Sequence, residues 1–472
     1  MKIVKGYFLI LMVSLIGFMF TYVSDANAIP AFARKYDVAC TLCHTTFPKL
    51  NDFGVNFRDN GYQMGADSDL PTNLEKGYFP LSFRTTVGYQ YASQNNVQGM
   101  NGNNVDNFSS GFGSTGMDFL SAGTLDRDIS FLVVPTGEYS VLGGQVTFHL
   151  ESAWVRFDNL NSNPMLNLKV GFGDIDLPFS EHRSLTLNTV YVIYHYLPGV
   201  PYNSSVFPVG DTTSTALPNN DGFAFGDHQG IMQLMGHMVD PLGNFRYAVN
   251  LISNNQYGGH DTGYYLHVTQ AMKGGGYSSG YRGGLFYLNM PMATVYDNTM
   301  GSAAAGGPNV GTSAKSVTKA GLDLSGNFLQ NKLNVFGVYM IGQDPKELIP
   351  NATDDAKFWG GFVEANYIYD PKLVLIARYD LIRNTTEPVS NVTPSGCGIL
   401  PSCSPSIPVS FDSSGYDDVD SYTLAARYAL VIHSRGEMWA HAEFNETTNK
   451  KTAFDGSNQT NDTIFLGFDF AF

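Results

Sequence analysis

The sequence has few charged residues and, beyond residue 22, no apolar run long enough for a membrane-spanning helix. Only 15% of the 472 residues are charged, and acidic residues outnumber basic ones by 42 to 27. The resulting net charge of −15, without any basic stripe, excludes nucleic acid as a partner because the phosphate backbone would repel the protein. The chain also lacks a Ser/His/Asp constellation and a phosphate-binding loop, which argues against hydrolase and nucleotide-dependent chemistry.

Cysteine is rare as well, and its four copies form two pairs. Cys397 and Cys403 lie in a segment rich in Gly, Pro and Ser, and we expect them to form a disulfide within a loop. Cys40 and Cys43 are separated by two residues and are followed at once by His44. In this attachment signature of c-type haem, both thiols add to vinyl groups of the porphyrin and the histidine binds the iron. We therefore predict one covalent haem c, with His44 as the proximal ligand.

Two other sites use a Cys-x-x-Cys motif. A zinc site needs a second pair of ligands, and no Cys-x-x-Cys or His-x-x-x-His recurs downstream. A thioredoxin-like redox motif would not require His44. Haem is therefore the favoured interpretation of the motif.

Residues 1–28 have the pattern of a secretory signal peptide. Lys2 and Lys5 provide a positive start, residues 7–22 are apolar, and Ala26-Asn27-Ala28 is a small-x-small cleavage site. An uncleaved anchor is disfavoured because the apolar run is short and ends in this cleavage site. Export agrees with haem c, which is attached outside the cytoplasm.

Beyond residue 78 the apolar residues recur with period two. The whole chain is rich in Gly (50), Tyr (27) and Phe (33). The final segment, residues 463–472, places Ile464, Leu466, Phe468, Phe470 and Phe472 on one face and Phe465, Gly467, Asp469 and Ala471 on the other. A terminal strand that ends in Phe resembles the assembly signal of bacterial outer-membrane proteins and argues against soluble β-sandwiches. We predict a mainly β fold: a transmembrane antiparallel β-barrel of about 16 strands, with a small α-helical N-terminal haem domain.

The expected strands lie near residues 79–92, 116–125, 129–137, 145–157, 167–176, 228–239, 244–253, 262–272, 281–291, 317–327, 332–342, 357–369, 372–383, 419–431, 436–446 and 463–472. An even number of strands puts both ends of the barrel in the periplasm, with short turns there and long loops outside. We expect long loops at 93–115, 292–316 and 384–418. We expect 177–227 to be a loop folded into or over the lumen, although its apolar part, residues 190–197, could instead be an extra strand.

The domain plan is therefore a signal peptide at 1–28, a monohaem plug at 29–78 and a porin-like barrel at 79–472. Within the plug, Leu50, Phe53 and Phe57 have helical spacing and could form one apolar face against the porphyrin. About fifty residues cannot bury a haem by themselves, because small domains bury little of their surface. We expect the barrel to cover the cofactor.

The sixth position of the haem iron has several candidate ligands. Met64 lies twenty residues after His44 and could supply a thioether. His149 and His441 lie on predicted lumen faces, and water or an empty position are further alternatives. Arg34 and Lys35 could pair with the haem propionates, or simply be solvated.

The N-terminal segment resembles the haem segment of the fused cytochrome–porins of the bacterial outer membrane, a family that includes iron oxidases. The matching run is Phe32-Ala33-Arg34, Cys40-Thr41-Leu42-Cys43-His44, Pro48-Lys49-Leu50, Phe53-Gly54, Phe57 and Asn60-Gly61-Tyr62. The motifs are confined to residues 30–62 and are more specific for the fused architecture than for iron as the substrate. The resemblance implies extracellular Fe(II) as the donor and a periplasmic c-type cytochrome as the acceptor.

We thus expect an outer-membrane protein that transfers electrons through one haem, as an oxidoreductase without a general base or nucleophile. The alternatives are a solute porin with a haem-containing plug, a conduit for outward electron flow, and a haem sensor. A filled lumen would favour electron transfer, and an open lumen would favour the porin. Barrels of this size are often trimers, so a homotrimer in outer-membrane lipid is a further expectation.

Overall fold

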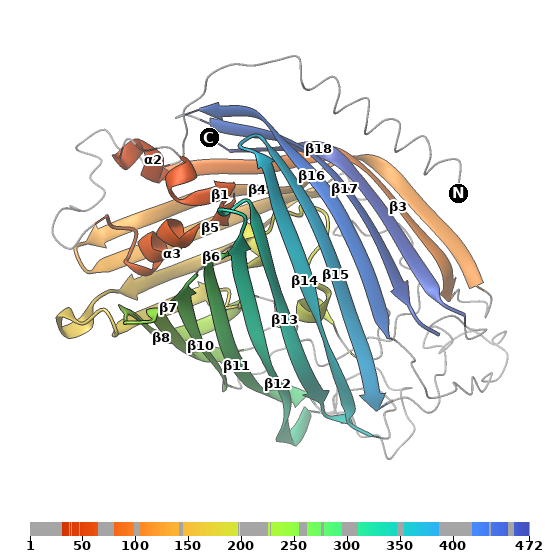
Figure 1. Cartoon of the computed structure of the whole chain (residues 1–472). Helices are drawn as coiled ribbons and strands as arrows, with labels where there is room; N and C mark the ends of the chain where they lie inside the picture. The colour runs from red at the N-terminus through yellow and green to blue at the C-terminus, as the bar shows by residue number, and fades with distance from the viewer. Residues whose placement is uncertain are drawn as a thin grey trace.

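The main element of the computed structural model is a closed barrel of sixteen antiparallel strands, β3 to β18, in which β18 pairs with β3 (Figure 1). The structure describes residues 31–36, 38, 40–46, 48–64, 80–98, 104–140, 145–196, 198, 225–226, 228–253, 262–274, 278–294, 310–346, 354–386, 418–433, 436–451 and 457–471. None of the helices in this part of the chain is long and apolar enough to cross a membrane.

The barrel strands are β3 (Leu81–Gln98), β4 (Asn104–Asp126), β5 (Ile129–Ser140), β6 (Gln145–Phe157), β7 (Asn167–Gly173), β8 (Gln229–Val239), β9 (Gly243–Ser253), β10 (Thr262–Lys273), β11 (Ser278–Thr294), β12 (Val310–Phe328), β13 (Leu333–Asp344), β14 (Ala356–Asp370), β15 (Leu373–Thr386), β16 (Val419–His433), β17 (Gly436–Asn449) and β18 (Gln459–Ala471). The predicted strand number is confirmed. Most strand ends agree with the prediction to within a few residues, but β4 and β12 begin 12 and 7 residues earlier than predicted and β3 ends 6 residues later.

The distribution of apolar and charged side chains on the strands is the reverse of that in a soluble protein. On β16, Leu424 is 59% exposed on the outer surface whereas Arg427 is fully buried inside. On β18, Phe468 is exposed and Asp469 is buried, so the predicted faces of the last strand are confirmed. Apolar side chains outside and charged ones inside are what a lipid bilayer requires of a barrel.

One of the predicted long loops is largely strand, and another is strand at both ends. β3 and β4 continue to Gln98 and from Asn104, so residues 93–115 form most of a hairpin. β11 and β12 likewise run to Thr294 and from Val310, into the predicted loop at 292–316. The Gly, Asn and Ser residues here suggested a loop, but ladder hydrogen bonds continue beyond the apolar band because the backbone does not require apolar side chains.

The segment 174–196 runs inside the barrel, as predicted. The Glu443 carboxylate on β17 accepts hydrogen bonds from the Leu187 backbone N–H at 2.8 Å and the Thr189 hydroxyl at 2.6 Å. On the opposite wall, the Tyr265 hydroxyl on β10 donates to the Asp176 carbonyl at 2.9 Å. We call this segment the inner loop. It contains the short helices η4 (Glu181–Arg183) and α4 (Val192–His195), so the alternative of an extra strand at 190–197 is wrong.

The inner loop fills part of the lumen with an apolar core. Its members Tyr191, Ile193 and Tyr194 are buried against inward-facing side chains of β8 to β16. The rings of Tyr191 and Phe362 stack at a centroid distance of 4.0 Å. This half of the lumen is therefore packed like a protein interior.

The N-terminal segment lies at the end of the barrel that carries the short turns (Figure 1). It consists of α2 (Ala31–Tyr36), η1 (Cys40–Leu42), β1 (His44–Thr46), β2 (Lys49–Leu50) and α3 (Asp52–Asp59). Gln63 donates to the Arg127 carbonyl in the β4–β5 turn at 2.6 Å, and Lys49 donates to Asn334 beside the β12–β13 turn at 2.7 Å. Short turns face the periplasm in such barrels, which places this segment on the periplasmic side.

The described part of this segment is not the predicted α-helical domain. Its two helices have only six and eight residues, and a small β1–β2 hairpin lies between them. The reason is that residues 40–50 are used to turn the chain tightly around the Cys-x-x-Cys-His motif. The domain limits at residues 29–78 stay a prediction, as do the signal peptide and the Cys397–Cys403 disulfide, which lie outside the described residues.

Candidate functional site

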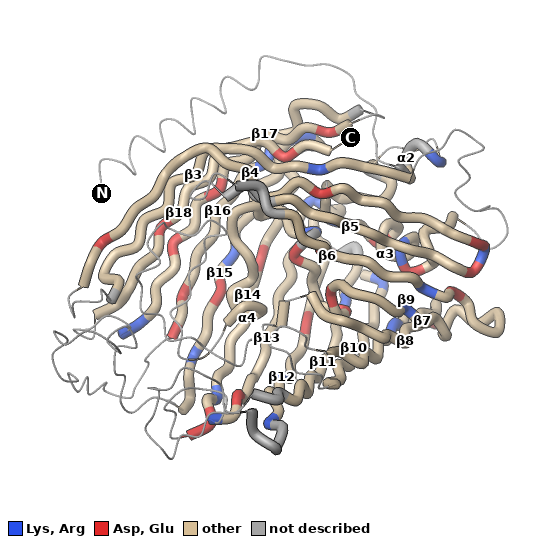
Figure 2. Tube along the Cα trace, turned by 180° about the vertical axis from the view of Figure 1, so that it is seen from behind, with Lys and Arg blue, Asp and Glu red and all other residues tan. Residues whose placement is uncertain are grey.

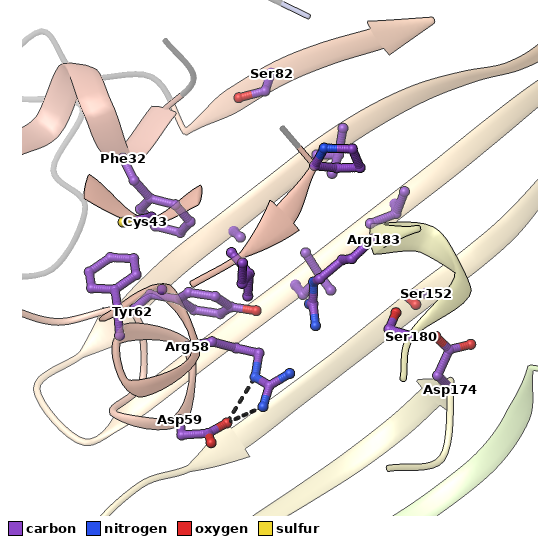
Figure 3. A pocket seen from close by; sticks show the side chains of 18 of the residues that line it. Phe32, Cys43, Arg58, Asp59, Tyr62, Ser82, Ser152, Asp174, Ser180 and Arg183 are labelled. Atoms are coloured by element: carbon purple, nitrogen blue, oxygen red, sulfur yellow. Dashed lines mark hydrogen bonds and ion pairs between the residues drawn. The ribbon is translucent and has the colours of Figure 1, made fainter. Parts of the chain in front are cut away.

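The Cys-x-x-Cys-His motif lines a cavity of about 340 Å³ between the N-terminal segment and the barrel wall (Figure 3). Cys40, Cys43 and His44 all border this cavity, and so does Met64. The opposite side comes from inward-facing residues of β3 to β9 and from the inner loop. A volume of this order is typical of small-molecule and cofactor sites.

Local hydrogen bonds fix the conformation of the motif. The backbone N–H of Cys43 donates to the Cys40 carbonyl at 3.0 Å and closes the η1 turn. Asn51 then ties the motif to the next helix: its backbone N–H donates to the Cys43 carbonyl at 2.9 Å, and its side-chain oxygen caps α3 by accepting from the Gly54 N–H at 2.9 Å. Both cysteines are therefore held on the same cavity by the cap of α3.

His44 is oriented by the carbonyl of Pro48, which lies 3.0 Å from its Nδ1. A proton on Nδ1 donated to this carbonyl places the lone pair on Nε2, the usual arrangement for a metal-ligating histidine. Burial lowers the pKa of His44 to about 4, although the Pro48 carbonyl acts in the opposite direction. The imidazole is thus neutral at physiological pH, the form that binds metals.

A cluster of aromatic side chains covers one side of the cavity. Tyr62 stacks on Phe32 at a centroid distance of 5.0 Å and on Trp154 of β6 at 6.2 Å. Phe57 meets Phe32 edge-to-face at 5.1 Å. Tyr62 can take this position because α3 ends in a Schellman turn, in which Gly61 has a φ of +71° and the Tyr62 N–H donates to the Phe57 carbonyl at 2.9 Å. A flat apolar ligand would find stacking partners here.

Ion pairs dock α3 on the barrel wall. Asp59 lies 2.8 Å from Arg58 and 2.9 Å from Arg246 of β9, and Arg246 also pairs with Asp176 of the inner loop. Arg156 of β6 donates to the Arg58 carbonyl at 2.8 Å. Figure 2 shows both basic and acidic residues around α3 and the neighbouring parts of β6, β7 and β9. Burial alone would raise the pKa of Asp59, but Arg246 and Arg58 hold it at about 2.

We expect acid to release α3 from the barrel wall before the barrel unfolds. The folded pKa of Asp59 lies below its ordinary 3.8, so its stabilising effect is complete above pH 3.8 and is lost as the pH falls toward 2. The loss corresponds to about 2 kcal/mol.

Trp154 fluorescence, which reports the contact with Tyr62, should change in this pH window. Asp59→Asn should remove the transition, and Asp52→Asn, an exposed change on the same helix, should retain it. Identical acid profiles of all three proteins would contradict the prediction.

The three candidate ligands for the sixth position of the haem iron lie in different places in the structure. Met64 lies on the cavity of His44 and packs against the Phe57–Tyr62 cluster. His149 lines a different cavity, and His441 is buried beside Glu443, with Nε2 at 2.8 Å from the carboxylate. Neither histidine borders the cavity of the motif in the described part of the chain. Met64 remains a predicted ligand.

Of the two cations predicted to pair with the haem propionates, the structure describes only the side chain of Lys35. Lys35 lies with its Nζ 4.9 Å from the Tyr36 ring centroid and does not border it. The side chain of Arg34 lies outside the described residues. Arg183 and Lys169, which the sequence analysis did not single out, do border the cavity. They are far from the motif in sequence, and only the closure of the barrel and the inward path of the inner loop bring them to it.

A second, polar cavity of about 320 Å³ adjoins the first. The two share Arg84, Asp118 and Glu151, and the second also contains His149 and His195. It lies along the unpacked half of the lumen, beside the inner loop.

The number of strands, their closure and their inverted polarity define this protein as an outer-membrane β-barrel of the porin type. The sequence matches no protein-family model and no curated protein.

Among solved structures, the chain is similar to several porins. An anion-selective porin from Comamonas acidovorans gives a TM-score of 0.47 at 10% identity, over 83% of this chain and 99% of that chain. OprB of Pseudomonas putida gives 0.44 at 13%, over 83% and 94%, and the outer membrane channel DcaP of Acinetobacter baumannii gives 0.42 at 10%, over 83% and 97%. The porin-barrel part of the predicted resemblance is confirmed by the strand pairing itself, and the cytochrome part stays a prediction.

Proposed function

We propose that this protein transfers electrons across the outer membrane, between an extracellular donor, soluble Fe(II) in the first instance, and a periplasmic c-type cytochrome. The observation that carries the proposal is the cavity on which Cys40, Cys43 and His44 meet, at the periplasmic end of a barrel with a partly packed lumen. A haem c bound there would supply one-electron redox chemistry.

The residues of the cavity fit this group. Cys40 and Cys43 would anchor it covalently, and His44, held by Pro48, would present Nε2 to the iron. Tyr62 and Trp154 would cover its flat face. The barrel thereby supplies the burial that the short N-terminal segment cannot provide. Exclusion of water by this wall favours the less charged, reduced state and so raises the reduction potential.

The second candidate function is a solute porin with a haem-containing plug. The porin-type barrel and the polar second cavity favour it. The inner loop argues against it, because Tyr191, Ile193 and Tyr194 pack one half of the lumen and the N-terminal segment occupies its periplasmic end. The second cavity has a volume of about 320 Å³ and a polar lining that includes Arg84, Asp118 and Glu151.

Rapid mixing of the purified, oxidised protein with Fe(II) at several pH values tests the proposal. We expect fast haem reduction, followed by stopped-flow absorbance, and a midpoint potential above that of the iron couple under the same conditions. The same spectra will reveal whether a methionine thioether, as predicted for Met64, holds the sixth position.

Dithionite serves as the control, because it reduces any accessible haem. Reduction by dithionite but not by Fe(II) would contradict inward electron transfer from iron and would favour outward flow. Conductance of planar bilayers by the same preparation, together with no reduction by Fe(II), would support the solute porin instead.

A further inference from the structure

Six cationic side chains line the cavity of the motif, and four of them are neutralised by a neighbouring carboxylate. The pairs are Arg58–Asp59 at 2.8 Å, Arg84–Asp469 at 3.1 Å, Arg156–Asp158 at 2.6 Å and Arg246–Asp59 at 2.9 Å. Lys169 and Arg183 are different. Within the described residues, neither has a carboxylate at salt-bridge distance.

Arg183 brings a positive charge from the inner loop into the cavity. Figure 3 shows its side chain extending from the inner loop toward Tyr62 and Arg58. Its charge acts on both His44 and Tyr62. Burial and the like charge of Arg58 lower the pKa of Arg183, while Asp174 and Asp59 only partly compensate. The guanidinium is therefore only partly compensated in the cavity.

Lys169 of β7 adds a second positive charge. Its Nζ lies 5.6 Å from the Trp154 ring centroid, at the aromatic wall of the cavity. Its strongest electrostatic interaction is with Asp176, and it also interacts with Asp174 and Arg58, the two residues that act on Arg183 as well. Both cations therefore face one region of the cavity. Partly buried cations without a carboxylate at salt-bridge distance are costly, so this region is suited to an anionic group.

We infer that Arg183 and Lys169 bind the two propionate carboxylates of the haem, an inference that rests on the proposed function. Two separate carboxylates on a flat apolar ring match two separate cations beside an aromatic wall. The guanidinium can bind one carboxylate with two parallel hydrogen bonds, and the ammonium can bind the other as a point charge. Arg183 belongs to the inner loop, which follows β7 and lies inside the barrel. It therefore ties the inner loop to a cofactor that is anchored on the periplasmic side.

The test uses Arg183→Gln, Lys169→Gln and the double variant in the full-length, haem-loaded protein. Haem should remain covalently attached, because Cys40 and Cys43 are unchanged. Removing a positive charge beside the haem disfavours the added electron, so the midpoint potential should fall in each variant and fall further in the double variant. The resonance Raman bending band of the propionates should also shift. Arg183→Lys should restore most of the potential, and it keeps the inference testable if the Gln variant misfolds.

Arg127→Gln is the matched control. It removes the same charge from an exposed turn that does not border the cavity, so the potential should not change. Covalently bound haem with an unchanged potential and an unchanged propionate band in both Gln variants would overturn the inference and leave the proposed function intact. A potential that depends on chloride in the wild type but not in Arg183→Gln would also overturn it, because the anion would then be a solute. Absence of covalent haem from the wild type would instead overturn the proposed function.

Discussion

Replacing both motif cysteines, Cys40→Ala together with Cys43→Ala, is expected to abolish covalent haem attachment and leave the barrel folded. The thiols are the only groups of the motif that can form thioether bonds to the porphyrin. The barrel should survive because its closed ladder of sixteen strands contains neither residue. Two functions of one chain, cofactor attachment and barrel closure, are thus carried by separate parts.

Haem staining of denaturing gels should give no signal for this variant in outer-membrane fractions. The shift in gel mobility between heated and unheated samples should persist, since it reports a closed barrel. The control is Cys397→Ala with Cys403→Ala, which removes the predicted loop disulfide and should keep the haem. Haem that remains covalently bound after Cys40 and Cys43 are replaced would refute the site.

Gly54→Ala is expected to disrupt the N-terminal segment although alanine favours helices. A Cβ at this position would lie 2.1 Å from the Cys43 carbonyl oxygen and 2.9 Å from the Leu50 side chain. Alanine in a helix interior normally gains about 1 kcal/mol over glycine, but this overlap should cost about 1–3 kcal/mol more than that gain. The helix α3 would have to move away from the turn that holds Cys43 and His44.

The expected result is a lower ratio of haem to barrel and a lower temperature for loss of the haem circular dichroism signal. Gly116→Ala is the matched control, because a Cβ there meets only a side-chain oxygen of Asp118 at 3.6 Å, an ordinary contact. If Gly54→Ala and Gly116→Ala behave alike, the close approach of α3 to the motif is not required for haem binding.

The barrel could be predicted in detail because each strand carries its own signal. The alternation around Phe465 and Asp469 assigned the two faces of β18 correctly, since the side-chain period of a strand is exactly two residues. The ends of β3, β4, β11 and β12 were misjudged. Their outer parts are polar and glycine-rich, and the hydrogen bonds that extend them join partners that sequence periodicity does not reveal.

The structure of the N-terminal segment was predicted less well than that of the barrel. The helical spacing of its apolar residues suggested a helical domain, but the short interval between Cys40 and Asn51 forms a tight turn and a hairpin instead. The helical spacing of the apolar residues Leu50, Phe53 and Phe57 was only partly informative. Phe57 is buried at the cavity whereas Phe53 is 41% exposed, because α3 also presents a polar side, with Asp59, to the barrel wall.

The sequence by itself determined the barrel class, the number of strands, their faces and the residues of the Cys-x-x-Cys-His motif. These features depend on local periodicity and on a motif of five consecutive residues. Only the tertiary structure decided that Trp154, Lys169, Arg183 and Arg246 border the same cavity as His44. Closure of the barrel and the inward path of the inner loop bring these residues together across more than a hundred positions of sequence, and neither leaves a periodic signal in the chain.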